Sequence, residues 1–161
     1  MTRAWEAFAL KYHIDVNEIL PAVQGKPTHE AILALRPSAS TDEVQKDAQC
    51  LEMMESNDTR GVVALPGAIE FLNILNNQSV PWAIVTSGTL PVATARIKAA
   101  NLPFPKVLIT PEQVSQGKPN PEPYILGAEK LNVNVHKCIV FEDAPAGVKL
   151  GVLAGAKAVA S

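Results

Sequence analysis

The sequence lacks the signatures of several classes of protein. Among its 161 residues are only two cysteines, far apart, and Cys138 lies in an apolar run typical of a buried strand, so we expect a reduced, cytoplasmic protein. With 14 basic and 16 acidic residues, the chain offers no basic footprint for nucleic acid and no polybasic patch for a membrane. No apolar stretch reaches the ~20 residues of a membrane-spanning helix, and we expect no signal peptide.

What is present is enough apolar sequence for a folded core, at 47% hydrophobic residues. In the first third of the chain apolar residues such as Trp5, Phe8 and Tyr12 recur at helical spacing. Helices are predicted over residues 1–24, 28–35 and 41–55, the last with Ser40 or Thr41 as its N-cap. A linker is predicted at residues 62–66, and the periodicity changes after it.

After the linker, short apolar runs alternate with helical patterns. Strands are predicted at residues 81–86, 106–110, 138–141 and 157–160, and helices at about 66–77, 91–100, 119–131 and 144–154. This alternation is typical of a parallel sheet with crossover helices. The predicted fold class is therefore α/β, with a helical segment in front of it.

Two adjacent acids follow the third of these strands. Ile139, Val140 and Phe141 form a run that suits a parallel strand covered on both faces, so Glu142 and Asp143 would lie at its carboxyl end, where ligands bind in α/β sheets. Neighbouring carboxylates repel unless a cation or a proton neutralises them, and Mg²⁺ prefers such oxygen ligands. The alternative is that Asp143 merely caps the following helix.

Two more polar sites are predicted beside the acids. Thr86-Ser87-Gly88 ends the first strand and offers a hydroxyl and successive backbone N–H groups to an anion, although a common turn would look similar. Lys118 stands between a glycine and a proline and could reach the same anion, although a surface lysine is the alternative. Hydroxyl, ammonium and paired acids at one sheet edge suit the handling of a phosphoryl group.

The segments T-S-G, G-K-P-N-P-E-P-Y and F-E-D-A-P-A-G, in this order, resemble motifs two, three and four of the haloacid dehalogenase (HAD) superfamily of phosphatases. The chain is most similar to the sugar phosphatase and glycerol-phosphate phosphatase group. The resemblance implies a Rossmann-like parallel core at residues 62–161 and an N-terminal helical cap at residues 1–61. Both are expected to be partial, with the first and last segments of the core absent.

The same resemblance implies roles for individual residues. Thr86 and the amides of Ser87 and Gly88 would hold the phosphoryl oxygens, and Lys118 would offset the charge of phosphate and nucleophile. Asp143, with Glu142, would bind Mg²⁺. In the cap, the loop containing Gly25 and Lys26 would face the sugar part of the substrate, a small-molecule phosphate ester.

The first motif of the family, a strand ending in D-x-D-G-T, does not occur in the sequence. Its aspartates supply the nucleophile and the general acid/base, whereas the five aspartates here are all isolated. In the family this strand lies between those corresponding to residues 81–86 and 138–141. We therefore expect an internal portion of a phosphatase, with the nucleophile upstream, and no activity from residues 1–161 alone.

The implied reaction is Mg²⁺-dependent hydrolysis of small sugar or polyol phosphates through an aspartyl phosphate. A sugar phosphomutase would use the same residues. A non-catalytic phosphate-binding or interaction module is the alternative from another class, since the nucleophile is missing.

Overall fold

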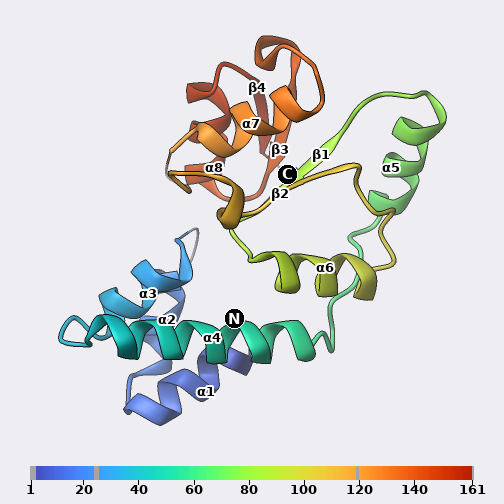
Figure 1. Cartoon of the computed structure of the whole chain (residues 1–161). Helices are drawn as coiled ribbons and strands as arrows, with labels where there is room; N and C mark the ends of the chain where they lie inside the picture. Colours follow the sequence, from blue (N-terminus) through green and yellow to red (C-terminus); the bar gives the residue numbers. More distant parts are fainter. Residues whose placement is uncertain (1–2, 24–25, 119, 161) are drawn as a thin grey trace.

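The computed structural model describes residues 3–23, 26–118 and 120–160, and it consists of a helical part followed by an α/β part (Figure 1). The helical part contains α1 to α4, and the α/β part contains the elements from α5 onward. Among the described residues no strand precedes residue 62, as the sequence predicts. Within those same residues, no helix is long and apolar enough to cross a membrane.

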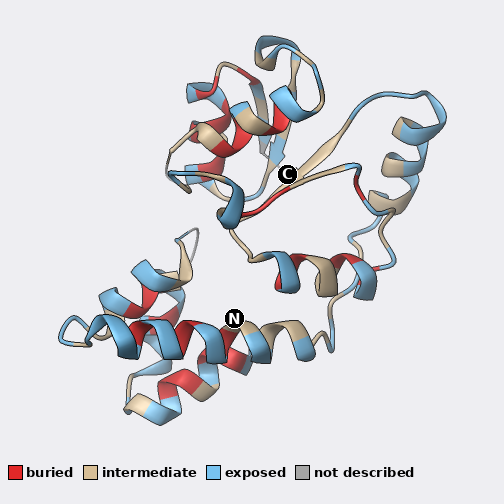
Figure 2. Cartoon of the chain, in the orientation of Figure 1, coloured by how far each residue is buried: buried red, intermediate tan, exposed pale blue. Residues whose placement is uncertain are grey.

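The helices of the helical part pack around a common apolar core. They are α1 (Arg3–Tyr12), α2 (Val16–Val23), α3 (Thr28–Leu35) and α4 (Thr41–Asn57). Their core cluster includes Trp5, Phe8, Ile19, Ile32 and Leu51. Figure 2 shows buried stretches on all four helices, with exposed residues on their outer faces. Each helix is thus amphipathic, and burial of the apolar stripes holds the helices together.

A single helix over residues 1–24 is wrong, because the chain turns between α1 and α2. His13 has a φ of 54°, in the left-handed region that commonly ends a helix. Asp15 then accepts a hydrogen bond from the backbone N–H of Asn17 at 2.8 Å, which satisfies one of the free N–H groups at the start of α2. Residues 1–2 and 24 lie outside the described residues.

The other helix predictions are confirmed, and the start of α4 shows why. The Ser40 hydroxyl accepts from the backbone N–H of Glu43, and the Glu43 carboxylate accepts from the backbone N–H of Ser40. This reciprocal capping box satisfies two N–H groups at the helix start. Of the two predicted N-caps, the structure selects Ser40.

Asp47 is a buried charge at the centre of the helical part. Its carboxylate accepts hydrogen bonds from Lys11 at 2.8 Å, from the hydroxyl of Tyr12 at 2.8 Å and from Arg36 at 2.6 Å. The donors come from α1 and from the residue that follows α3, so the network links both helices to α4. A buried carboxylate is tolerated only with such partners, which makes this cluster a constraint on how the helices pack.

The α/β part alternates helices and strands along the chain. Its elements are α5 (Ala68–Asn77), β1 (Ala83–Val85), α6 (Leu90–Ala99), β2 (Val107–Ile109), η1 (Pro111–Gln113), α7 (Glu122–Lys130), η2 (Val135–Lys137), β3 (Ile139–Glu142), α8 (Pro145–Leu153) and β4 (Lys157–Ala160). The four strands and four helices predicted after the linker are all present. The short turns η1 and η2 are 3₁₀-helices.

The strands form two separate parallel pairs. β1 pairs with β2, aligning Ala83 with Val107, and β3 pairs with β4, aligning Ile139 with Lys157. The α/β class and the parallel direction are confirmed, but the described residues do not form one continuous sheet. β1 and β3 each pair along one edge, and no described strand is hydrogen-bonded to the other edge. Two rows of backbone groups therefore lack a strand partner.

The expectation that strand 139–141 is covered on both faces is wrong for the described residues. Val140 packs against the cluster of Tyr124, Leu150 and Ala154, which lies under the strand pairs. On the opposite face Ile139 is 57% exposed and Phe141 is 56% exposed. Phe141 packs there edge-to-face on Phe71 of α5, with 5.5 Å between the ring centroids. One face is thus buried under helices and the other is largely open.

The two parts of the molecule meet where α4 packs against α6. Arg96 of α6 lies 3.2 Å from the carboxylate of Glu55 of α4. Because α6 directly follows β1 and its turn, this contact holds the helical part close to the carboxyl end of β1 (Figure 1). The same end of the strands carries the polar residues described below.

Residues 1–161 by themselves should be unstable in the α/β part. Along the free edges of β1 and β3, ~4 to 6 backbone hydrogen bonds are unmade, and each would contribute ~1 kcal/mol net. This loss is a large share of the ~5–15 kcal/mol by which a typical domain is stable against unfolding. Amide hydrogen exchange should show β1 and β3 exchanging well before α4, whose helical part has its own core. Equal protection of α4 and β3, or one cooperative unfolding transition of the monomer, would contradict this expectation.

Candidate active site

The turn after β1 is built by a local hydrogen bond. The backbone N–H of Gly88 donates to Oγ1 of Thr86 at 3.0 Å, which closes a tight turn before α6. The Thr86 hydroxyl accepts in this contact, so its own hydrogen is available to an anion. The amide of Gly88, predicted to bind a phosphoryl oxygen, is paired with Thr86 in this arrangement.

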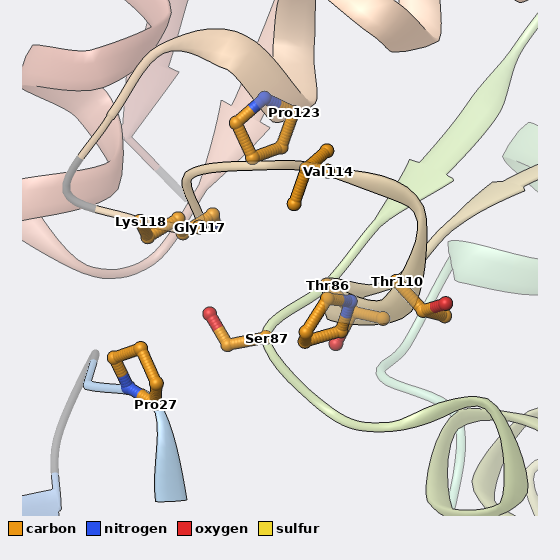
Figure 3. A pocket seen from close by; sticks show the side chains of 9 residues that line it. Pro27, Thr86, Ser87, Thr110, Val114, Gly117, Lys118 and Pro123 are labelled. Atoms are coloured by element: carbon orange, nitrogen blue, oxygen red, sulfur yellow. The ribbon is translucent and has the colours of Figure 1, made fainter. Parts of the chain in front are cut away.

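This turn borders a pocket formed by both parts of the molecule. The pocket is lined by Pro27, Thr86, Ser87, Thr110, Pro111, Val114, Gly117, Lys118 and Pro123. Figure 3 shows the Ser87 side chain directed into the space between Pro27 and Lys118. Three of the predicted site residues, Thr86, Ser87 and Lys118, are therefore brought together from segments far apart in the sequence.

Lys118 also contacts one of the predicted metal ligands. Its Nζ lies 2.8 Å from Oε2 of Glu142, and both side chains are 13% exposed. The hydroxyl of Tyr124 donates to the same oxygen at 2.6 Å. The Lys118 ammonium also lies 5.0 Å from the centre of the Tyr124 ring. The pair links the loop before α7 to the carboxyl end of β3.

These contacts fix the ionisation of Glu142 and Tyr124. Burial favours the neutral acid, but the hydrogen bonds from Lys118 and Tyr124 outweigh it and hold the pKa of Glu142 well below its usual range. Burial, followed by the hydrogen bond to Glu142, raises the pKa of the Tyr124 hydroxyl. At neutral pH Glu142 is therefore an anion and Tyr124 a protonated donor.

The two acids at the end of β3 fit part of a Mg²⁺ site. Oε2 of Glu142 is occupied by two donors, whereas Oε1 has one long contact, at 3.4 Å from the backbone N–H of Ala144. Asp143 is exposed, and the N-cap of α8 is Ala144, which makes no side-chain capping hydrogen bond, so the capping alternative for Asp143 is wrong. Across the described residues, no group of three acid, histidine or cysteine side chains is placed to hold a metal. The further ligands that a Mg²⁺ ion needs would have to come from outside the described residues.

The remaining predicted residues lie apart from this cluster. Lys26 is exposed and is absent from the pocket lining, and Gly25 lies outside the described residues. The neighbouring Pro27 lines the pocket instead. No role was predicted for Tyr124, although it ends the segment G-K-P-N-P-E-P-Y, and the structure buries it in the first turn of α7.

The sequence is similar to those of known phosphatases. Hexitol phosphatase A of Escherichia coli is 42% identical over 98% of this chain and 73% of its own length. Glycerol-1-phosphate phosphohydrolase 2 of Saccharomyces cerevisiae is 31% identical over 96% of this chain and 65% of its own length. The chain thus spans about two thirds to three quarters of these relatives.

Solved structures share the fold. A hydrolase from Pseudomonas syringae superimposes with a TM-score of 0.78 and 27% identity, covering 98% of this chain and 74% of the other. A β-phosphoglucomutase from Clostridium difficile gives a TM-score of 0.81 at 21% identity, covering 98% and 75%, which supports the fold alone. The model of the haloacid dehalogenase-like hydrolase family matches residues 6–155, and the chain belongs to this family of hydrolases.

Proposed function

We propose that this chain is the phosphate-binding and metal-binding portion of a Mg²⁺-dependent phosphomonoesterase that acts on small sugar or polyol phosphates. The observation that carries the proposal is the meeting of Lys118 and Glu142 beside the pocket lined by Thr86 and Ser87. A cation, a carboxylate and hydroxyl donors at one sheet edge suit a dianionic phosphate and the charge that develops during its transfer. The relatives named as hexitol and glycerol-1-phosphate phosphatases favour phosphates of linear polyols.

In this proposal each described residue has one task. Thr86 and Ser87 donate to phosphoryl oxygens, and the amide of Gly88 joins them if it leaves Thr86. Lys118 offsets negative charge on the transferred group, which is mainly electrostatic and positional work. Asp143 and Oε1 of Glu142 would hold Mg²⁺, which when bound supplies further positive charge at the phosphoryl group.

The nucleophile is proposed to be an aspartate on a strand that residues 1–161 do not contain. Its place is between β1 and β3, because each has an unpaired edge among the described residues. Val85 of β1 and Val140 of β3 also pack on one cluster, so the two edges belong to one layer. The aspartate would attack phosphorus, the alcohol would leave as it gains a proton, and water would hydrolyse the aspartyl phosphate.

The helical part is proposed to act as a cap, with the boundary to the core at residues 61–62. Support comes from Pro27, which reaches the pocket of the α/β part, and from the contact of α4 with α6. The loop with Gly25 and Lys26 remains the predicted contact to the polyol. A cytoplasmic location remains a prediction from the sequence, in keeping with two free cysteines.

Lys118→Ala, in a protein that carries residues 1–161 together with the proposed strand, should lower kcat by about 10²- to 10³-fold and change KM much less. The reason is that its charge is needed most when negative charge builds up in the transition state. Phosphate release from a hexitol phosphate measures the effect. Lys130→Ala, an exposed lysine in the last turn of α7, is the matched control and should leave turnover unchanged. A kcat of wild-type size in Lys118→Ala would show that the assignment is wrong.

Asp143→Asn in the same protein should weaken Mg²⁺ binding by about tenfold or more, because a neutral amide replaces an anionic oxygen at a hard cation. Isothermal titration with Mg²⁺ alone measures this without any turnover. Asp42→Asn changes an exposed aspartate of α4 in the same way and should bind Mg²⁺ like the wild type. Unchanged Mg²⁺ affinity in Asp143→Asn would remove Asp143 from the proposed site.

A further inference from the structure

Tyr124 has no part in the function proposed above, yet its hydroxyl is a direct neighbour of the groups that do. It donates to Oε2 of Glu142 at 2.6 Å, and Lys118 donates to the same oxygen at 2.8 Å. Hydrogen bonds to a charged acceptor are the stronger kind, and two of them on one oxygen restrict rotation of the carboxylate. The direction of Oε1, the oxygen proposed to face Mg²⁺, depends on this restriction.

The hydroxyl also affects what Lys118 can do. An ammonium has three N–H donors, and one of them is used on Glu142. Because Tyr124 satisfies part of the same oxygen, Glu142 does not depend on Lys118 alone. The other two N–H donors of Lys118 remain for the pocket that it lines.

Tyr124 is rigidly held in this position. It is 7% exposed and belongs to the cluster with Leu150 and Ala154. One turn further along α7, Gly127 lets the helix approach β1, since a Cβ there would lie 3.2 Å from Val85. The phenol is thus fixed by packing on both strand pairs, as a group that orients others must be.

Glu142 is confined from the other side by Gly147. Any Cβ at position 147 would overlap the carboxylate of Glu142, so the first turn of α8 leaves room only because this residue is glycine. The carboxylate therefore occupies a slot between α8 and the donors Tyr124 and Lys118. The contacts on both sides hold the Glu142 carboxylate in one orientation.

We infer that Tyr124 is a positioning residue, which orients Glu142 toward the cation and keeps Lys118 directed at the phosphoryl group. The inference rests on the function proposed above. A purely structural tyrosine would contribute to folding alone, whereas this one should affect metal binding and turnover in a folded protein.

Tyr124→Phe removes only the hydroxyl and keeps the buried ring. Loss of a partner that orients a metal ligand typically costs 10- to 100-fold, so Mg²⁺ affinity should fall by about tenfold and kcat by about 10- to 100-fold. KM should stay within about threefold, since the effect falls on the transition state. The measurements are titration with Mg²⁺ alone and phosphate release from a hexitol phosphate, in the protein that carries the proposed strand.

Tyr12→Phe is a closely matched control. The Tyr12 hydroxyl also donates to a buried carboxylate that is paired with a lysine, Asp47 with Lys11, but this cluster lies in the helical part. Both variants should lower the midpoint of thermal unfolding, while only Tyr124→Phe should change Mg²⁺ affinity and kcat. A double variant completes the test: in a Glu142→Ala background, Tyr124→Phe should have less than about a twofold further effect.

The proposed function and the positioning role of Tyr124 can be rejected separately. A wild type that releases no phosphate but binds Mg²⁺ more tightly than Tyr124→Phe would reject the proposed function and keep the positioning role. An active wild type with equal Mg²⁺ affinity and kcat in Tyr124→Phe would overturn the positioning role alone. A wild type that binds no Mg²⁺, or an undiminished effect of Tyr124→Phe in the Glu142→Ala background, would overturn it as well.

Discussion

The ionised carboxylate of Glu142 connects the two strand pairs of the α/β part. It stands at the end of β3, and its partners are Tyr124 of α7, which packs on β1 and β2, and Lys118 of the loop before that helix. Since each pair has its own hydrogen-bonded ladder, their relative placement depends on this polar contact and on the apolar cluster under it. This partly buried ion pair contributes little net stability, but its short contact holds the loop before α7 against the end of β3, which is what a site assembled from separate strands requires.

Much of this architecture could be predicted because it depends on local chemistry. Ser40 and Glu43 predict the start of α4. The apolar runs before Thr86 and Glu142 indicate where two parallel strands end, and the side chains at these ends converge. The resemblance in motif order then predicted the family. The single helix predicted over residues 1–24 failed for a reason that apolar spacing does not show. The left-handed residue His13 interrupts an amphipathic pattern that would otherwise continue.

Burial in the strands could not be predicted from their sequence. An apolar run such as residues 139–141 indicates where side chains would be buried in a complete sheet, whereas exposure of Ile139 and Phe141 depends on which other elements are present. The partnership of Tyr124 with Glu142 is likewise a tertiary contact between residues 18 positions apart. Sequence spacing assigns residues to a sheet edge, but it does not reveal which of them share one oxygen.

The proposed catalyst combines residues of this chain with one strand that residues 1–161 do not contain. Phosphate release from a hexitol phosphate with Mg²⁺ tests this combination most directly, measured for residues 1–161 alone and for the same residues preceded by an apolar strand ending in D-x-D-G-T. The account predicts no turnover by residues 1–161 alone, and turnover with the strand that is lost when its first aspartate becomes asparagine. Mg²⁺-dependent turnover by residues 1–161 alone that disappears in Asp143→Ala would contradict it.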